Sequence, residues 1–404
     1  MTTPTPSPQR VNLRTPEVMS LVQAQVESHY RSDIVDHLRA NGGSITAGQV
    51  TVKLAKQFGF CYGVERAIDL AYAAAKVFAG RRLFILGEII HNPEVNQQIR
   101  EMGIQNLVGK SGVPDLDRLA PGDVVIVPAF GTDVNTLERI RESGCQIVDT
   151  TCGDVMSVWK RVRQNASSDV TSIIHGKAQH EETKATASRA LIGGKGHYLV
   201  LLTLEETDIL CDYIRHGGNK ADFLARFQGA FSEGFDPDLH LRRVGIANQT
   251  TMLQGETEEV QRRIKAAVEA RDGVELARES FRFFDTICGA TQERQDALAE
   301  MVNQPMDLLL VVGGYNSSNT SHLAEMGEEI LPTYFIGNAS RLGSREHIRH
   351  FDLQKREEIV TAHWMPAPPV TIGITAGASC PNNLIEETVV RVFELHGIKR
   401  DALL

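Results

Sequence analysis

The chain has 404 residues, 42% of them hydrophobic, and this length favours two or three domains with sizeable cores. Its 42 basic and 51 acidic residues give a net charge of -9, without the basic cluster typical of nucleic-acid binding. No stretch approaches the roughly 20 apolar residues of a membrane helix, and the N-terminus lacks the apolar h-region expected of a secretory signal. We therefore expect a cytoplasmic globular protein that binds neither nucleic acid nor membrane.

Residues 1–50 are the least core-like part of the chain and read as an N-terminal extension. The opening TTPTPSPQR predicts disorder over about the first dozen residues. Acidic residues such as Glu17 and Asp33 argue against an organelle transit peptide, because transit peptides are poor in acids. The later half of the extension, from Val22 to Leu38, predicts a helix lying on the first domain.

After residue 50, apolar runs of strand length alternate with segments of helical period, which predicts an α/β fold with largely parallel sheets. The predicted strands are Leu83 to Leu86, Val124 to Val127, Ser172 to Ile174, Tyr198 to Leu202, Arg243 to Ala247, Leu308 to Val312, Tyr334 to Ile336 and Val370 to Ile374. The predicted helices include Glu65 to Phe78, Glu256 to Arg271, Gln292 to Val302 and Asn383 to His396.

Polar, glycine-rich turns follow six of these strands: GEIIHNP, PAFGTD, HGKAQHEE, NQTT, GGYNSSNT and TAGASCP. Ligands of parallel sheets bind at the carboxyl ends of strands. Two such turns fall in each third of the chain, so we expect three similar small α/β domains, over 51–150, 151–285 and 286–404, with their strand ends facing a shared centre. Residues 205–241 are longer than a connection requires and predict an insertion.

Three cysteines recur in one setting, where hydrophobic sequence gives way to a turn or a helix. Cys61 lies in FGFCYGVERAI, Cys152 in VDTTCGDV and Cys288 in FFDTICGAT. A helix N-terminus favours the thiolate that a metal requires. Three thiolates from three separate units suit an iron–sulfur cluster with one iron open to substrate, although each cysteine alone could be an inert residue packed in a turn.

The other cysteines are Cys145, Cys211 and Cys380, which we interpret as structural. Six cysteines in a chain of this size are too few for a disulfide framework, and a reducing cytosol would keep them as thiols.

Two histidines occupy strand-end turns, His91 in GEIIHNP and His180 in GKAQHEET, the latter near Glu182. Such a pair could flank an anionic ligand, whereas a single loop histidine is more often a surface or capping residue. The HExxH zinc-protease signature is excluded, because Lys184 stands where its second histidine would be.

The turn GGYNSSNT combines glycines with Ser317, Ser318 and Asn319 at the start of a helix, and TAGAS repeats the design with Ser379. Amides, hydroxyls and the helix dipole at such a corner bind phosphate, so the two turns together predict a phosphate or diphosphate ligand. One turn alone could be an ordinary helix cap. A P-loop is excluded, since no GK[ST] follows.

These motifs resemble the 4-hydroxy-3-methylbut-2-enyl diphosphate reductase family over about residues 51 to 395. The resemblance rests on GFCYGVERAI, the HN of IIHNP, DTTC, HEE, NQTT, ICGAT, NSSN and TAGAS in the family's order. It implies reductive dehydroxylation of (E)-4-hydroxy-3-methylbut-2-enyl diphosphate to isopentenyl and dimethylallyl diphosphate, the last step of the methylerythritol phosphate pathway.

The resemblance also implies three α/β domains in pseudo-threefold arrangement around a central 4Fe-4S cluster, one per subunit, with one iron not held by cysteine. The cluster ligands implied are Cys61, Cys152 and Cys288. The diphosphate contacts implied are His91, His180, Ser317, Ser318, Asn319 and Ser379. Glu182 maps onto the proton-delivering acid, and Thr250 onto the hydroxyl that positions substrate and relays the proton.

The chain departs from many members of this family at two positions. Phe130 in PAFGTD stands where an AHG turn carries histidine, and Glu181 stands where HPE carries proline. The phenylalanine, the stretch HYRSDIVDHLRANGG and the insertion resemble the longer branch found in cyanobacteria and plastids.

Two other classes remain open from the sequence. A cluster-dependent lyase such as quinolinate synthase also surrounds a three-cysteine cluster with three α/β domains, but it turns over without net electrons. An iron–sulfur sensor would not need two phosphate corners. The reductase needs an external electron donor, for which a ferredoxin or flavodoxin is expected because no flavin or nicotinamide motif is evident.

Overall fold

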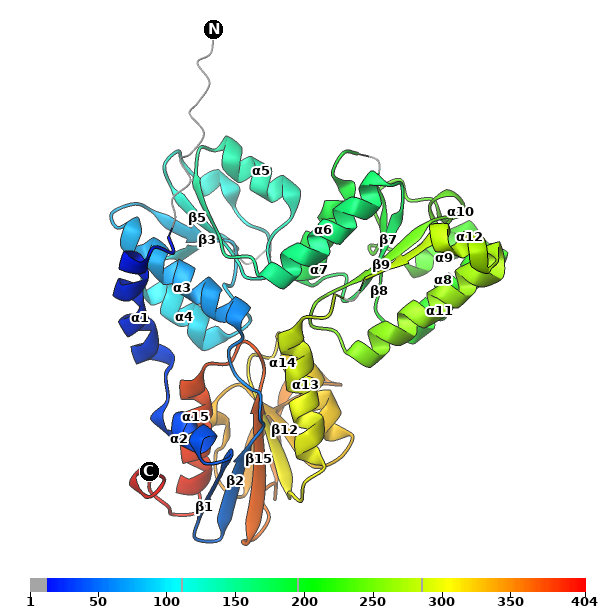
Figure 1. The fold of residues 1–404 in the computed structure, drawn as a ribbon. Helices are drawn as coiled ribbons and strands as arrows, with labels where there is room; N and C mark the ends of the chain where they lie inside the picture. The colour runs from blue at the N-terminus through cyan, green and yellow to red at the C-terminus, as the bar shows by residue number, and fades with distance from the viewer. Residues whose placement is uncertain (1–12, 110–111, 195, 285) are drawn as a thin grey trace. The chain divides into compact units, whose positions relative to one another are not determined.

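The structure, a computed structural model, describes residues 13–109, 112–194, 196–284 and 286–404 (Figure 1). The expected disorder of the first dozen residues lies outside these ranges. The chain divides into two compact units. The middle unit contains Leu107–Cys288, and the terminal unit contains Gln9–Asn106 together with Gly289–Leu404.

The terminal unit is built on a seven-stranded sheet. Its order is β1 (Ser44–Ala47), β2 (Val50–Leu54), β15 (Val370–Ala376), β11 (Leu308–Val312), β12 (Thr333–Ile336), β13 (His347–Asp352) and β14 (Glu357–Ala362). The strands from β2 to β12 pair in parallel, and antiparallel hairpins form both edges. The hairpin strands were not among the predicted elements.

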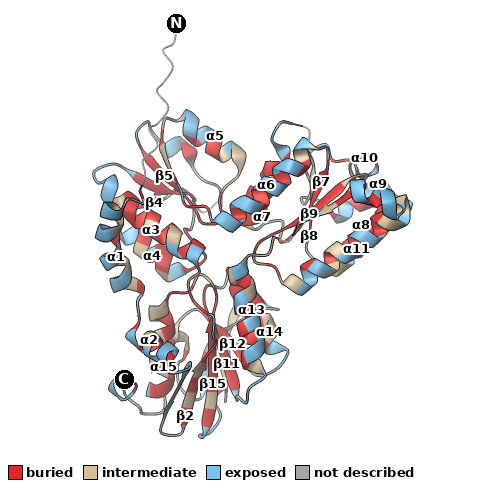
Figure 2. Ribbon diagram, viewed as in Figure 1, coloured by how far each residue is buried: buried red, intermediate tan, exposed pale blue. Residues whose placement is uncertain are grey.

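Both faces of this sheet are covered by helices, which explains the uninterrupted apolar run of β11. Leu308, Leu310 and Val312 belong to a core shared with α2 (Asp33–Ala40) and α15 (Asn382–Glu394). Leu309 and Val311 belong to a second core with α13 (Gly289–Val302) and α14 (Ser318–Glu328). β11 is buried along its whole length. Figure 2 shows the central strands as mostly buried, while the helices are buried on one side and exposed on the other.

A smaller part of the terminal unit contains α3 (Tyr62–Val77), β3 (Leu83–Ile85), α4 (Pro93–Glu101) and β4 (Gln105–Asn106). β3 and β4 pair in parallel. Cys61 is the N-cap residue of α3, and Asn92 caps α4 by accepting hydrogen bonds from the backbone amides of Glu94 and Val95.

The N-terminal extension forms two helices, so the single helix predicted from Val22 to Leu38 is wrong. α1 (Pro16–Tyr30) ends before Arg31, and α2 begins after Ser32. The Ser32 side chain accepts a hydrogen bond from the Val35 amide, which stabilises a new helix start and explains the break. α1 packs against α3, whereas α2 packs against α15 and β1.

The middle unit contains a four-stranded parallel sheet in the order β10 (Phe281–Phe283), β9 (Val244–Asn248), β7 (Thr171–His175) and β8 (Tyr198–Leu201). β5 (Val124–Val127) and β6 (Gln146–Asp149) form another parallel pair. The helices of this unit outside the predicted insertion are α5 (Val134–Glu142), α6 (Gly153–Ser167), α7 (Glu181–Ser188), α11 (Gln254–Asp272) and α12 (Val274–Ser280).

The segment predicted as an insertion is helical. It forms α8 (Leu204–His216), α9 (Lys220–Arg226) and α10 (Pro237–His240). Phe223, Phe227 and Phe235 join the core formed by α8, α11 and one face of the four-stranded sheet. The segment therefore contributes to the stability of the middle unit.

Short 3-10 turns complete the description at Leu116–Arg118, Arg189–Leu191, Ala339–Arg341 and Arg400–Ala402. The predicted α/β class is confirmed, and each of the eight predicted strands is present with ends shifted by at most two residues. Among the helices that the structure describes, none is long and apolar enough to cross a membrane.

Candidate functional site

The residues singled out from the sequence divide between the two units. The terminal unit contains Cys61, His91, Ser317, Ser318, Asn319 and Ser379. The middle unit contains Cys152, His180, Glu182, Thr250 and Cys288.

In the terminal unit, the NSSN and TAGAS turns are in direct contact. Ser317 caps α14, with its hydroxyl oxygen accepting a hydrogen bond from the Thr320 hydroxyl at 2.9 Å. The Asn319 Oδ1 accepts a hydrogen bond from the Ala378 amide at 2.9 Å. A side chain at Gly377 would overlap the Thr320 hydroxyl, so the close approach of the two turns requires glycine there. Ser379 lies two residues after Gly377 in the same turn and is half-buried.

The side-chain amide of Asn319 is buried in this corner and has an unused donor. Asn319 is 2% exposed, and its Nδ2 makes no hydrogen bond within the described residues. A buried donor without an acceptor costs about 1–3 kcal/mol, so native structures rarely keep one unless a ligand or water satisfies it. Ser317 and Ser318 are also buried beside it at the N-terminus of α14. Phosphate oxygens suit this set of donors.

The Cys61 turn adjoins the same corner. The backbone amide of Cys61 donates to the carbonyl of Ala378 at 3.3 Å, and Gly59 adopts φ +76° against the carbonyl of Cys380. Arg294 on α13 is 3% exposed and donates to the carbonyls of Gly59 and Phe60. This arginine fixes the turn that carries Cys61, and the sequence analysis did not identify it.

His91 also lies against the NSSN turn. A side chain at Gly314 would overlap the His91 carbonyl. His91 Nδ1 lies 3.1 Å from the Glu88 carboxylate. The same carboxylate accepts a hydrogen bond from the side-chain amide of Asn316 at 2.8 Å. A carboxylate at Nδ1 orients the imidazole ring of His91. Glu88 and Asn316 were missed because their role depends on contacts between distant parts of the chain.

In the middle unit, His180, Glu182 and Thr250 are connected by hydrogen bonds. His180 caps α7, with its Nδ1 accepting a hydrogen bond from the Glu182 amide at 3.2 Å. His180 is therefore a helix-capping residue. Because its Nδ1 accepts this hydrogen bond, Nε2 is the nitrogen that carries the hydrogen and can donate. Glu182 is 3% exposed, and its Oε1 accepts a hydrogen bond of 2.6 Å from the Thr250 amide.

Cys288 continues this chain of contacts, since its amide donates to the Thr250 carbonyl at 3.2 Å. Cys152 is the N-cap residue of α6, and its amide donates to the Ala129 carbonyl at 2.8 Å. Cys152 also packs against the small core that contains Trp159. Both cysteines are half-buried and free of disulfides, as is Cys61.

The remaining cysteines have a different environment. Cys145, Cys211 and Cys380 are fully buried. Burial raises the pKa of Cys211 to about 11 and also raises the pKa of Cys380. Cys145 donates a weak hydrogen bond to the Ala120 carbonyl. These surroundings disfavour thiolates.

Phe130 lies in the turn after β5 and is 9% exposed. The adjacent Gly131 has φ +81°, and a side chain there would overlap Trp159. Arg189 stacks on the Trp159 ring at 3.8 Å and donates to the Thr132 carbonyl at 2.9 Å, while burial lowers the pKa of Arg189 to about 10. The turn is thus held against α6 by packing.

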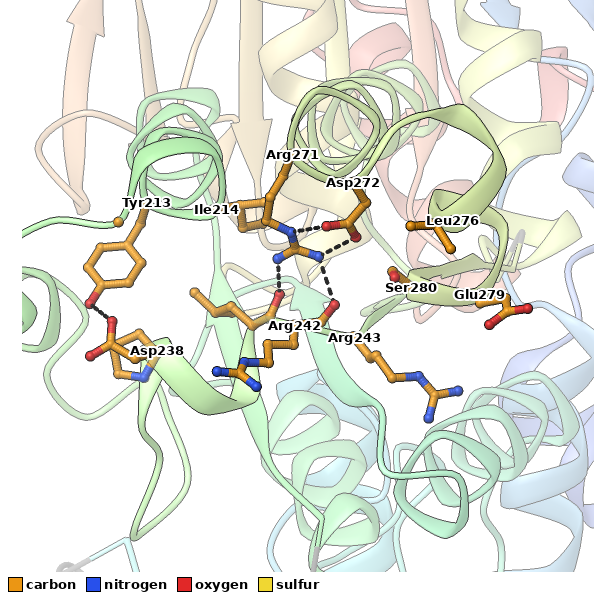
Figure 3. Close-up of a pocket in the computed structure, with 13 residues that line it drawn as sticks. Tyr213, Ile214, Asp238, Arg242, Arg243, Arg271, Asp272, Leu276, Glu279 and Ser280 are labelled. Atoms are coloured by element: carbon orange, nitrogen blue, oxygen red, sulfur yellow. Dashed lines mark hydrogen bonds and ion pairs between the residues drawn. The ribbon is translucent and has the colours of Figure 1, made fainter.

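A separate hollow of about 530 Å³ lies at the amino-terminal ends of β9 and β10 (Figure 3). Arg271 crosses it, bonded to Asp272 and to the carbonyls of Leu241 and Arg242. None of the predicted site residues that the structure describes lines this hollow. The predicted site residues of the middle unit come after the carboxyl ends of strands, at the end of the sheet opposite to this hollow. Parallel sheets bind ligands at that end.

The chain is similar to known proteins over most of its length. Residues 52–393 match the family model described as "LytB protein". A 4-hydroxy-3-methylbut-2-enyl diphosphate reductase of Gloeobacter violaceus is 50% identical, covering 93% of this chain and 90% of that protein. One of the same name from Thermosynechococcus vestitus is 47% identical, covering 93% of this chain and 92% of that protein.

Two solved structures are also similar. One is titled as (E)-4-hydroxy-3-methyl-but-2-enyl diphosphate reductase, the terminal enzyme of the non-mevalonate pathway; it has a TM-score of 0.53 at 26% identity and covers 85% of this chain and 99% of that one. The other, from Plasmodium falciparum, has a TM-score of 0.61 at 20% identity and covers 84% and 86%, which supports the fold alone.

Proposed function

Since the chain belongs to the LytB protein family, we propose that it reduces (E)-4-hydroxy-3-methylbut-2-enyl diphosphate to isopentenyl and dimethylallyl diphosphate. The relatives that carry this activity in their names match 93% of the chain. Among the observations on the structure, the buried side-chain amide of Asn319 supports the proposal most directly, because its Nδ2 has no acceptor within the described residues and can donate to a diphosphate oxygen at the NSSN corner.

We propose that Cys61, Cys152 and Cys288 hold a 4Fe-4S cluster, one per subunit, with one iron left without cysteine. The donor set supports this: all three cysteines are half-buried, none is in a disulfide, and Cys61 and Cys152 are the N-cap residues of α3 and α6. The backbone amide of each cysteine donates a hydrogen bond to a backbone carbonyl, which holds the backbone at that cysteine in place. A bound cluster supplies the two electrons, one at a time, and a Lewis-acidic iron.

The diphosphate binds, in this proposal, at the NSSN and TAGAS turns. Ser317, Ser318 and Asn319 offer donors at the N-terminus of α14, and Ser379 offers a hydroxyl from the neighbouring turn. His91 and His180 add imidazole groups. The Glu182 amide donates to Nδ1 of His180, so Nε2 of that ring carries the hydrogen, and the Glu88 carboxylate orients the ring of His91 through its Nδ1. Binding energy spent on the diphosphate positions the reacting hydroxyl.

Glu182 is proposed to deliver the proton that leaves with the substrate hydroxyl as water. The overall change consumes two electrons and two protons: the C–O bond breaks, one proton completes the water, and the other adds to either end of the allylic unit. Burial of Glu182 suits a proton donor, and the amide of Thr250 holds its carboxyl group in place. The Thr250 hydroxyl is proposed to position substrate and relay the proton.

The two electrons are proposed to come from a ferredoxin or flavodoxin. The cytoplasmic location stays a prediction from the sequence.

Anaerobic assay of the purified protein with (E)-4-hydroxy-3-methylbut-2-enyl diphosphate tests the function. Both isopentenyl and dimethylallyl diphosphate should form only when a reductant is supplied. Turnover without reductant would support a lyase, and no turnover with reductant, in protein that contains its cluster, would contradict the proposal. Mössbauer spectra with and without substrate should change at one iron site.

A further inference from the structure

Behind the proposed phosphate donor Ser318 lies a histidine that no predicted motif includes. His322 follows Ser318 by one helical turn on α14, and its Nε2 lies 3.4 Å from the Ser318 hydroxyl oxygen. Its Nδ1 lies 2.7 Å from the carboxylate of Glu325. Ser318 and His322 are each 5% exposed, so water competes little for either contact.

The carboxylate determines which ring nitrogen carries the first proton. An ionised carboxylate only accepts hydrogen bonds, so Nδ1 of His322 must carry a hydrogen to bond Glu325. Nε2 is then an acceptor when the imidazole is neutral and a donor when it is protonated. The Ser318 hydroxyl must therefore donate to Nε2 when the imidazole is neutral and accept from Nε2 when it is protonated.

These two states present different surfaces to a phosphate oxygen. With neutral His322, the Ser318 hydroxyl hydrogen points to Nε2, and only oxygen lone pairs remain for the ligand, which repel an anion. With protonated His322, Nε2 donates to the serine oxygen, and the hydroxyl hydrogen is available to the phosphate. The imidazolium also adds a positive charge near the site.

We propose that His322 is a positioning residue that couples diphosphate binding to the uptake of a proton. This inference rests on the proposed diphosphate site at Ser318. Diphosphate binds better to the protonated state and therefore draws the imidazole toward that state. Affinity is fully present below the pH at which the free protein loses this proton. It falls as pH rises from there to the pH at which the bound complex also loses it, by up to about tenfold per pH unit.

Within the described residues, the charged groups around α14 differ from element to element. The elements that pack most closely against α14 are α13, β11, β12 and β15. The three strands have the sequences LLLVV, TYFI and VTIGITA, which contain no carboxylate or basic side chain; Tyr334, with a pKa raised by burial, is their titratable group. On α13, Glu293, Asp296 and Glu300 are exposed, and Arg294 is directed to the carbonyls of Gly59 and Phe60.

Two further groups belong to the same surroundings. Glu328 on α14 has a pKa raised by burial and by the nearby carboxylates of Asp352, on β13, and Glu325. The His91–Glu88 pair meets the turn before α14 through Asn316. His91 also has a carboxylate at Nδ1 and can take up a proton on binding, so the contribution of His322 must be measured as a difference.

Calorimetric titration of the anaerobically purified protein with inorganic diphosphate, in buffers of different ionisation enthalpy, counts the protons taken up. At a pH where free His322 is mostly neutral, the wild type should take up about one proton more than His322→Gln. The glutamine amide is a donor at every pH, so this variant should still bind diphosphate, with an affinity that falls less steeply as pH rises. His363→Gln is the matched control, because His363 also pairs with a carboxylate, Glu346, yet is largely exposed on a hairpin.

Equal proton uptake by the wild type and His322→Gln would overturn the coupling while leaving the diphosphate site intact. Absence of diphosphate binding by the wild type would overturn both. Glu325→Gln provides a second variant that keeps the imidazole but removes the charge that favours its protonation. Its affinity should begin to fall at lower pH than that of the wild type, and an unchanged pH profile would contradict the proposal.

Discussion

The carboxylate of Glu182 accepts a 2.6 Å hydrogen bond from the backbone amide of Thr250, and the carbonyl of Thr250 in turn accepts one from the amide of Cys288. A proposed acid and a proposed cluster ligand are therefore joined through a single residue. Movement of this residue would affect both, which makes the geometry of the NQTT turn a determinant of proton delivery.

Replacement of Glu182 by Gln should leave cluster absorbance intact and lower turnover by about 100- to 10,000-fold, the usual contribution of a positioned acid. Glutamine can still accept the Thr250 amide bond, so the fold should persist. Glu181→Gln is the matched control, since Glu181 is the exposed neighbour on α7. Similar turnover in the two variants would remove Glu182 from the mechanism.

Replacement of Cys152 by Ser should abolish cluster absorbance and activity, because a serine hydroxyl does not become an anion at neutral pH as a thiol at a helix N-terminus does. Cys145→Ser should retain both, since Cys145 is buried and bonded to a carbonyl. Visible absorption and iron content of anaerobically purified variants measure the result. The reverse pattern would mean that the ligands are misassigned.

Replacement of Asn319 by Asp should weaken diphosphate binding at least tenfold. The carboxylate keeps an acceptor for the Ala378 amide but replaces the buried donor with a negative oxygen, and a hydrogen bond to a charged group is typically worth about 1.5–3 kcal/mol. Asn303→Asp, at an exposed position on the loop after α13, should bind as the wild type does. Titration with inorganic diphosphate provides the comparison, and equal affinities would contradict the assigned corner.

Replacement of Arg294 by Lys should lower the free energy of unfolding by about 1–3 kcal/mol, because lysine cannot reproduce the fork of donors to the carbonyls of Gly59 and Phe60 and leaves a buried acceptor unsatisfied. Urea denaturation of the apoprotein measures this loss. The control is Arg262→Lys, at an exposed ion pair on α11. If both variants were equally stable, Arg294 would not be what holds the Cys61 turn.

The strand-end turns could be predicted because the strands before them, such as LLLVV, are covered on both faces and so are continuously apolar. The helix break at Ser32 was missed, since the apolar pattern continues across it and only the capping bond marks the new start. The strands β13 and β14 were missed because they form an exposed edge hairpin with polar and charged residues on both faces.

Within the site, the sequence identified residues whose neighbours in the chain form a motif. It did not identify Arg294 or His322, because an arginine or histidine on a helix has the same local sequence whether it is buried or exposed. The Gly59 and Phe60 carbonyls to which Arg294 donates lie more than 230 residues away in the chain. Glu88 and Asn316 depend in the same way on contacts formed only after folding.

Gly377 has a practical consequence for mutational studies. A methyl group at this position would push the TAGAS turn away from Thr320 and separate two loops that must stay adjacent. A Gly377→Ala variant would therefore lose activity in a screen just as a variant of a substrate-binding residue would. Glycine, however, has no side chain that could contact a substrate. Only a measurement of local structure would distinguish displacement of the two turns from loss of a substrate contact.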